Sequence, residues 1–79
     1  MRQETQVTLD AIIRAVLELP ADAVVANVRQ EGTAAWDSLA HAVMVGAIES
    51  EFGLQIDAAD SLELSSYEAI GSFLTERGL

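Results

Sequence analysis

Apolar residues in the first quarter of the chain recur at helical spacing. The pattern i, i+3, i+4, i+7 is made by Leu9, Ile12, Ile13, Val16 and Leu17. A proline at position 20 disfavours the helical conformation in the residue before it. The pattern therefore predicts a helix over residues 4–19. The acids along and after it are expected to form a solvated face: Glu4, Asp10, Glu18 and Asp22.

A long connection follows, from Pro20 to Trp36. Connections of this length in compact domains are usually functional or partly ordered. The valines within it are expected to hold it across the core, with a short helical turn over residues 21–25. We expect Trp36 to cover the loop.

A second helix is predicted over residues 38–52. Asp37 is suited to be its N-cap, because a carboxylate can accept hydrogen bonds from first-turn amides. Gly53 is suited to end it. The expected inward stripe is Met44, Val45, Ile48 and Phe52.

Two further helices are predicted near the end of the chain. Asp57 is expected to cap a short helix that runs to about Leu62. Ser65 and Glu68 have the spacing of a capping box and predict a last helix ending at Gly78. Its inward residues are expected to be Tyr67, Ile70, Phe73 and Leu74. The whole pattern predicts an all-α fold, a four-helix bundle in one domain over residues 1–79, with a long first loop and a short third helix.

The composition argues against an enzyme. The chain is 51% hydrophobic and can bury a core, but it has no Cys and only one His. Thiolate metal sites, His clusters and a thiol nucleophile are thereby excluded. We expect His41 to be a packing residue near the buried side of the second helix.

The charge limits the partners. The net charge of −9 repels nucleic acid and anionic membranes and attracts basic protein surfaces, although acidity also serves solubility. The longest uncharged apolar stretch, Leu39 to Ile48, is shorter than the roughly 18 residues of a membrane span. No secretory signal is evident at the start, so we expect a soluble, cytoplasmic protein.

The segment Trp36-Asp37-Ser38-Leu39 carries the candidate chemistry. It places a serine hydroxyl at a helix N-terminus, where a phosphate ester would meet free amides and the positive end of the helix dipole. Asp37 could help to hold magnesium near a phosphate during transfer. Alternatively, Asp-Ser-Leu is only a common way to begin a helix.

Over nearly its whole length the chain resembles the acyl carrier proteins. The shared features are a first helix, a long loop, Asp-Ser-Leu at the start of the second helix, and an Ile-x-x-x-Phe-Gly ending at Ile48 to Gly53. The apolar pair Leu54 and Ile56, the acidic segment Asp57 to Asp60 and the fourth helix also match. Trp36 before Asp-Ser-Leu is similar to a variant found in carriers of specialised pathways.

This resemblance implies that Ser38, flanked by Asp37 and Leu39, receives 4'-phosphopantetheine from coenzyme A. The arm would carry acyl groups as thioesters for a fatty-acid, polyketide or other specialised biosynthetic pathway. The chain would then be a carrier and not an enzyme. The implied partners are a phosphopantetheinyl transferase, a loading ligase or transferase, and a downstream synthase or acyltransferase.

In the family, the second helix is the main docking helix. The matching outward positions give an expected partner surface of Trp36, Leu39, Ala42, Val43, Gly46 and Glu49, with Ser50 on the same face. Usual carriers often have acids at the positions of Val43 and Ser50. We therefore expect a small, apolar docking face that fits a dedicated partner.

Two other functions stay open from the sequence. An aminoacyl or peptidyl carrier would share the fold and the modified serine, although such carriers more often have two glycines and a His or Asp before the serine. An unmodified acidic adaptor would keep the apolar face without needing Ser38. A monomer is expected in each case.

Overall fold

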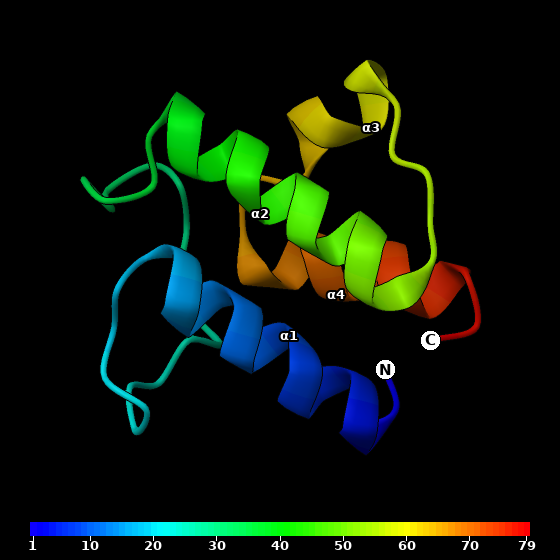
Figure 1. The fold of residues 1–79 in the computed structure, drawn as a ribbon, viewed down its shortest axis with the longest axis horizontal. Coiled ribbons are helices and arrows are strands. Elements are labelled where there is room, and N and C mark those ends of the chain that lie inside the picture. The colour runs from blue at the N-terminus through cyan, green and yellow to red at the C-terminus, as the bar shows by residue number, and fades with distance from the viewer.

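The chain forms four helices in the computed structural model, which describes residues 1–79. They are α1 (Gln3–Val16), α2 (Ser38–Phe52), α3 (Ala58–Glu63) and α4 (Tyr67–Glu76). There is no strand, only an isolated β-bridge between Arg29 and Ser66. The predicted all-α fold, with four helices, a long first loop and a short third helix, is confirmed (Figure 1).

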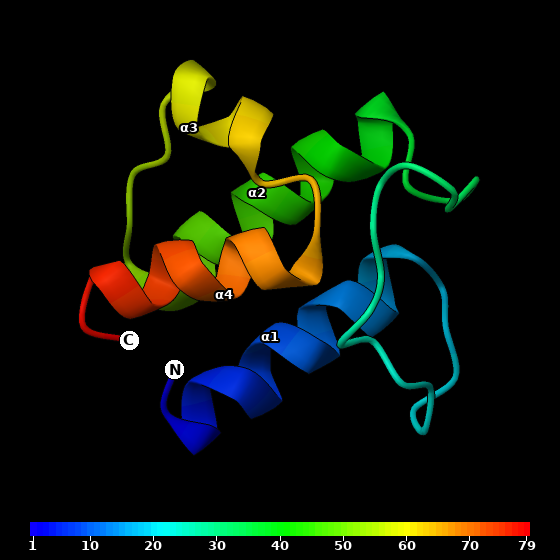
Figure 2. The same cartoon turned by 180° about the vertical axis from the view of Figure 1, so that it is seen from behind.

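The helices α1 and α2 run antiparallel and pack against each other, with α4 crossing behind them (Figures 1 and 2). The short α3 lies apart from α1, beyond the other side of α2. Thirteen buried apolar residues from the helices and loops form one cluster, to which α1 gives Leu9, Ile12 and Ile13 and α4 gives Ile70 and Leu74. This single core fixes the start of α2 relative to the end of α1.

The first helix ends at Val16, three residues earlier than the apolar pattern predicts. The amide of Glu18 donates to the carbonyl of Ala15, and the amide of Leu19 donates to that of Arg14 at 2.8 Å. This is a Schellman closure, which needs a left-handed residue, and Glu18 supplies it with φ 57°. Apolar residues after the helix still pack on the core, which is why periodicity overestimated its length.

The long loop contains turns but no helix, so the predicted helical turn over residues 21–25 is wrong. The loop is held by the buried side chain of Val25 and by Arg14, whose Nε donates to the carbonyl of Ala23 at 2.9 Å. Farther along, the amide of Gln30 donates to the carbonyl of Ser65 at 2.8 Å. The prediction that its valines hold the loop against the core is thus met by Val25 and Val28, whereas Val24 is exposed.

The last helix begins one residue later than predicted. Its N-cap is Ser66, whose Oγ accepts from the amide of Ala69 at 3.0 Å, so the predicted capping box of Ser65 and Glu68 is wrong. The carbonyl of Ser65 instead accepts the amide of Gln30 in the loop. The carbonyl of Val28, also in the loop, accepts the amide of Tyr67, which would otherwise be free at the start of the helix. The helix ends through Gly78, as predicted.

The other caps agree with the prediction. Asp37 and Asp57 each accept a 2.8 Å hydrogen bond from the amide three residues on, and Gly53 ends α2 in the left-handed conformation. One inward residue differs, because Val45 is only half-buried and lies outside the core cluster. None of the helices is long and apolar enough to cross a membrane.

Candidate functional site at the start of α2

Ser38 is the first residue of α2 and is exposed to solvent. The cap of the helix is the residue before it, because Asp37 accepts the amide of Ala40. The hydroxyl of Ser38 makes no hydrogen bond within the protein, and the amides of the first turn have no intrahelical acceptor. The hydroxyl of Ser38 is therefore exposed and unpaired at the N-terminus of α2.

Trp36 lies under the site and not on its surface. Its side chain is 2% exposed and belongs to the core cluster. The expectations that it covers the loop and joins a partner surface are therefore wrong. The turn from Thr33, whose carbonyl accepts the amide of Trp36 at 3.0 Å, directs the indole inward.

His41 connects three parts of the molecule beneath Ser38. Its Nδ1 accepts from the indole of Trp36 at 3.0 Å, and its Nε2 lies 2.8 Å from the carbonyl of Ser61 in α3. One ring nitrogen must therefore accept and the other donate, as in a neutral imidazole. The prediction that His41 is a packing residue agrees with its half-buried position, but its two hydrogen-bond partners could not be predicted from the sequence.

The outward face predicted for α2 is exposed in the structure. The residues of this face are Leu39, Ala42, Val43, Gly46 and Ser50, all on the solvent side. Leu39 is 75% exposed and Val43 is 52% exposed, which is unusual for large apolar side chains one turn apart. The structure thus places an apolar strip next to Ser38.

This strip borders an open groove of about 380 Å³ between the end of α1 and the start of α2. Its walls are mainly apolar, and two carboxylates, those of Glu18 and Asp37, also line it. The sequence placed Val16 and Leu17 in the core and Glu18 on a solvated face, so it did not reveal that all three line this groove. The only local signal was Glu18 itself, a residue other than glycine at the position where the end of the helix needs a left-handed backbone conformation.

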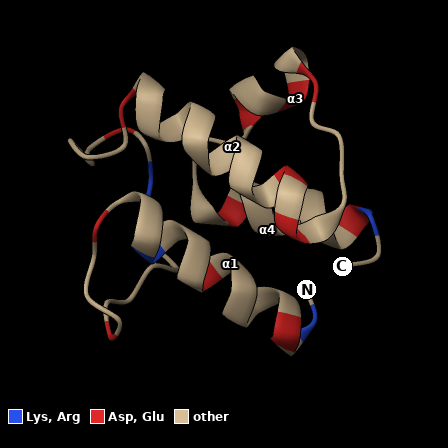
Figure 3. Cartoon of the chain, viewed as in Figure 1, with Lys and Arg blue, Asp and Glu red and all other residues tan.

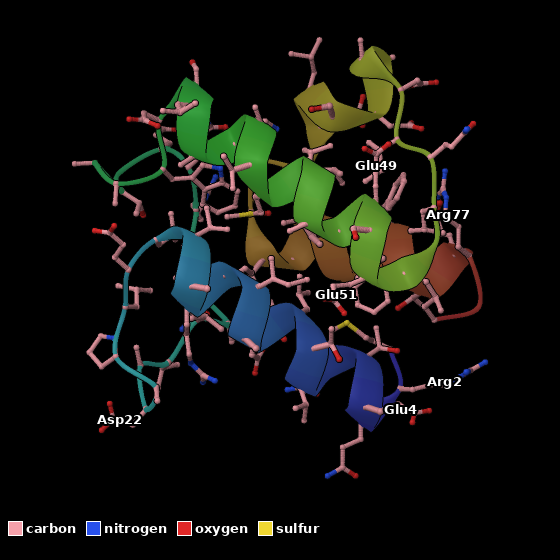
Figure 4. The ribbon with its side chains drawn as sticks, in the orientation of Figure 1. Arg2, Glu4, Asp22, Glu49, Glu51 and Arg77 are labelled. Atoms are coloured by element: carbon pink, nitrogen blue, oxygen red, sulfur yellow. The ribbon has the colours of Figure 1, made fainter.

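Glu49, expected in the partner surface, serves the fold instead. It is half-buried, and its Oε2 accepts from the amide of Ile56 at 2.8 Å. Figure 4 shows its side chain turned toward the connection that leads to α3, whereas Glu51 leaves the other side of α2. The carboxylate is therefore engaged within the molecule.

Charge is distributed unevenly around the site. Between residues 38 and 48 there is no Asp, Glu, Lys or Arg, and the first turns of α2 are uncharged in Figure 3. Acids lie at both ends of this stretch, at Asp37 and from Glu49 onward. No group of three or more side chains is arranged to hold a metal ion.

Comparisons with family models, with characterised proteins and with solved structures find no match to this chain. The fold and the site define a small all-α protein that presents an exposed serine hydroxyl at a helix N-terminus. An apolar strip and an open groove lie next to that hydroxyl.

Proposed function

We propose that the protein is an acyl carrier that holds a 4'-phosphopantetheine arm on Ser38. The observation that carries this proposal is that one residue caps the start of α2 and the next residue presents a free hydroxyl. Asp37 does the capping, so the exposed hydroxyl of Ser38 is left without a role in the fold.

The residues present fit such a group. A phosphodiester on Ser38 would lie at the positive end of the α2 dipole, near the free amides of Ser38 and Leu39. Asp37 opposes it with one negative charge, which a magnesium ion brought by the modifying enzyme would offset. When bound, the arm supplies a terminal thiol that carries acyl groups as thioesters, a sulfur that the Cys-free chain lacks.

The chemical step at Ser38 is a phosphoryl transfer. The Oγ of Ser38 forms a bond to the phosphorus that carries pantetheine in coenzyme A, and the bond from that phosphorus to the nucleotide portion breaks. The proton of the hydroxyl passes to a base of the transferase. The chain's own contribution is to hold the nucleophile exposed on a capped, rigid helix end.

Intact-mass measurement tests the proposal. The protein is incubated with coenzyme A, magnesium and a broad-specificity phosphopantetheinyl transferase, beside Ser38→Ala and Ser50→Ala. Ser50 is the matched control because it is also exposed on α2. We expect a gain of one phosphopantetheine in the wild type and in Ser50→Ala, and none in Ser38→Ala.

The opposite result has a clear meaning. No gain in the folded wild type, with a transferase that modifies another carrier, would favour the unmodified adaptor. If the wild type is modified, loading of the modified protein with acyl or aminoacyl groups by candidate ligases separates the two kinds of carrier.

A further inference from the structure

The ring of His41 occupies a position that only its neutral form fits. Its Nδ1 accepts the indole N–H of Trp36 at 3.0 Å, and its Nε2 donates to the carbonyl of Ser61 at 2.8 Å. The hydroxyl of Ser61 is also 3.3 Å from the same Nε2. A protonated ring has an N–H on both nitrogens and no acceptor. Protonation would therefore place two N–H groups against each other between His41 and Trp36.

Of these two residues, His41 is the one that is free to move. Trp36 is enclosed in the core cluster, whereas His41 is half-buried at the side of α2. A buried N–H without an acceptor is costly, so the protonated ring does not remain beside the indole. Rotation of the ring toward solvent lets water accept from both of its N–H groups, and this movement also breaks the bond to Ser61.

The helix α3 has few other contacts that hold it in place. None of its residues is buried, and Leu62 is 83% exposed. An open groove of about 330 Å³ lies between α3 and α4. The ion pair between Asp60 and Arg77 bridges the two helices at 3.7 Å, but both side chains are partly exposed, and such pairs contribute little. The bond between His41 and Ser61 is therefore a main attachment of α3, which stands beyond α2 between two connecting segments (Figure 2).

We propose that His41 is a pH-sensitive link that holds α3 against α2 when its ring is neutral and releases α3 when its ring is protonated. The link consists of Trp36, His41 and Ser61. It is complete at neutral pH and is lost as the pH falls through the mildly acidic range in which histidine gains its proton. Opening of the link changes both the loop before Ser38 and the position of α3. The inference does not depend on the modification of Ser38.

The charged groups near His41 do not oppose the uptake of a proton. None of them forms an ion pair with the ring, and most are carboxylates. On the surrounding elements they are Arg29, Glu31 and Asp37 in the loop, Glu49 and Glu51 in α2, Asp57, Asp60 and Glu63 at α3, and Glu68, Glu76 and Arg77 at α4. The response to pH therefore comes from the hydrogen bond to Trp36 and not from a neighbouring charge.

Nuclear magnetic resonance between about pH 7.5 and about pH 5.5 tests the link, since most carboxyl groups stay ionised in this range. The ring of the one histidine reports its own protonation. Hydrogen exchange of the amides of Ser61 and Leu64, corrected for the intrinsic effect of pH, reports the opening of α3, because a helix of six residues is not stable without tertiary contacts. The amide of Ile70 in α4 is the control for unfolding of the whole domain.

Two variants separate the proton from the bond that it breaks. His41→Asn takes up no proton but still offers an acceptor to Trp36. Trp36→Phe keeps the titrating ring and removes the indole N–H that conflicts with it. Circular dichroism establishes that each variant is folded.

We expect exchange at Ser61 and Leu64 in the wild type to become about 5- to 10-fold faster as His41 is protonated, the factor that corresponds to about one hydrogen bond. In both variants the change should stay below about twofold, although the ring still titrates in Trp36→Phe. Exchange at Ile70 should stay within about twofold in all three proteins.

Three results would overturn the proposal. The first is a wild-type ring that stays neutral over the whole range, and the second is unchanged exchange in α3 while the ring is protonated. The third is an equal increase in the wild type and in His41→Asn. An increase at Ile70 that matches the increase in α3 would also overturn it, because the whole domain would then open and the link would not act locally.

Discussion

The indole Nε1 of Trp36 donates a 3.0 Å hydrogen bond to Nδ1 of His41, and the two rings are stacked with centroids 6.1 Å apart. The other nitrogen of His41 donates to the carbonyl of Ser61. The tautomer follows from these partners, because an indole N–H can only donate and a carbonyl can only accept. Through His41, the loop before Ser38 is joined to α2 and to α3.

Replacing His41 should therefore destabilise the fold. In His41→Phe the ring is kept but the buried indole N–H of Trp36 loses its acceptor, which costs about 1–3 kcal/mol. His41→Asn can still offer an acceptor and should lose less. The free energy of unfolding is measured in urea through the fluorescence of the one tryptophan. A loss below about 0.5 kcal/mol in His41→Phe would show that the hydrogen bond is not a significant source of stability.

The sequence predicted those features whose causes are local. Asp37 and Asp57 act on an amide three residues away, and Gly53 acts through its own φ, so each has a recognisable pattern within one turn. The exposed face around Leu39 and Val43 was predicted from the resemblance, which indicated the docking helix, together with the helical geometry of 100° per residue.

What the sequence could not show depends on contacts between distant segments. Ser65 and Ser66 are equally good caps, and the choice is made by Gln30 of the loop, which takes the carbonyl of Ser65. Glu49 binds an amide seven residues away across a chain reversal. Whether the side chain of Trp36 is buried or exposed depends on a loop that has no periodic pattern of apolar residues. The positions and contacts of such residues can be determined only from the assembled fold.

The carboxylate of Glu49 gives a second prediction. In Glu49→Ala the half-buried amide of Ile56 loses a charge-assisted acceptor, and stability should fall by about 1–2 kcal/mol. Glu51→Ala is the matched control, since Glu51 is exposed, and it should stay within about 0.5 kcal/mol. Urea denaturation of both variants decides the matter, and equal losses would mean that the contact to Ile56 adds nothing.

The single tyrosine predicts a change at high pH. The pKa of Tyr67 is raised from 10.0 to about 12, first by burial and then by the hydrogen bond to Asp10 and the charge of that carboxylate, with Arg14 acting in the opposite direction. Asp10 is half-buried, with its Oδ1 enclosed and unpaired, so it is not the solvated acid expected from the sequence.

The neutral phenol of Tyr67 is the form that the folded state favours. The unfolded chain loses the proton near pH 10 and the folded chain near pH 12. The contribution of Tyr67 to stability is therefore fully present below about pH 10 and is lost progressively as the pH rises toward 12. Tyrosinate absorbance measures the titration directly, because the chain has no other tyrosine. Asp10→Asn should lower the pKa of Tyr67, and an unchanged value would remove Asp10 as a cause.

Glu18 gives the last prediction, which concerns the cost of its backbone conformation. In Glu18→Gly the strain of a Cβ at φ 57°, about 1–2 kcal/mol, is relieved. The extra freedom that glycine gives the unfolded chain returns about 0.4–1 kcal/mol of this. We expect a net stabilisation of about 0.5–1 kcal/mol, or a few degrees in Tm for a domain of this size.

Glu18→Ala is the matched control, because it removes the same carboxylate and keeps the Cβ in the left-handed region. It should therefore gain no stability. Thermal unfolding of both variants beside the wild type separates the loss of the carboxylate from the relief of strain. If Glu18→Gly were less stable than the wild type, the left-handed conformation at Glu18 would carry no cost.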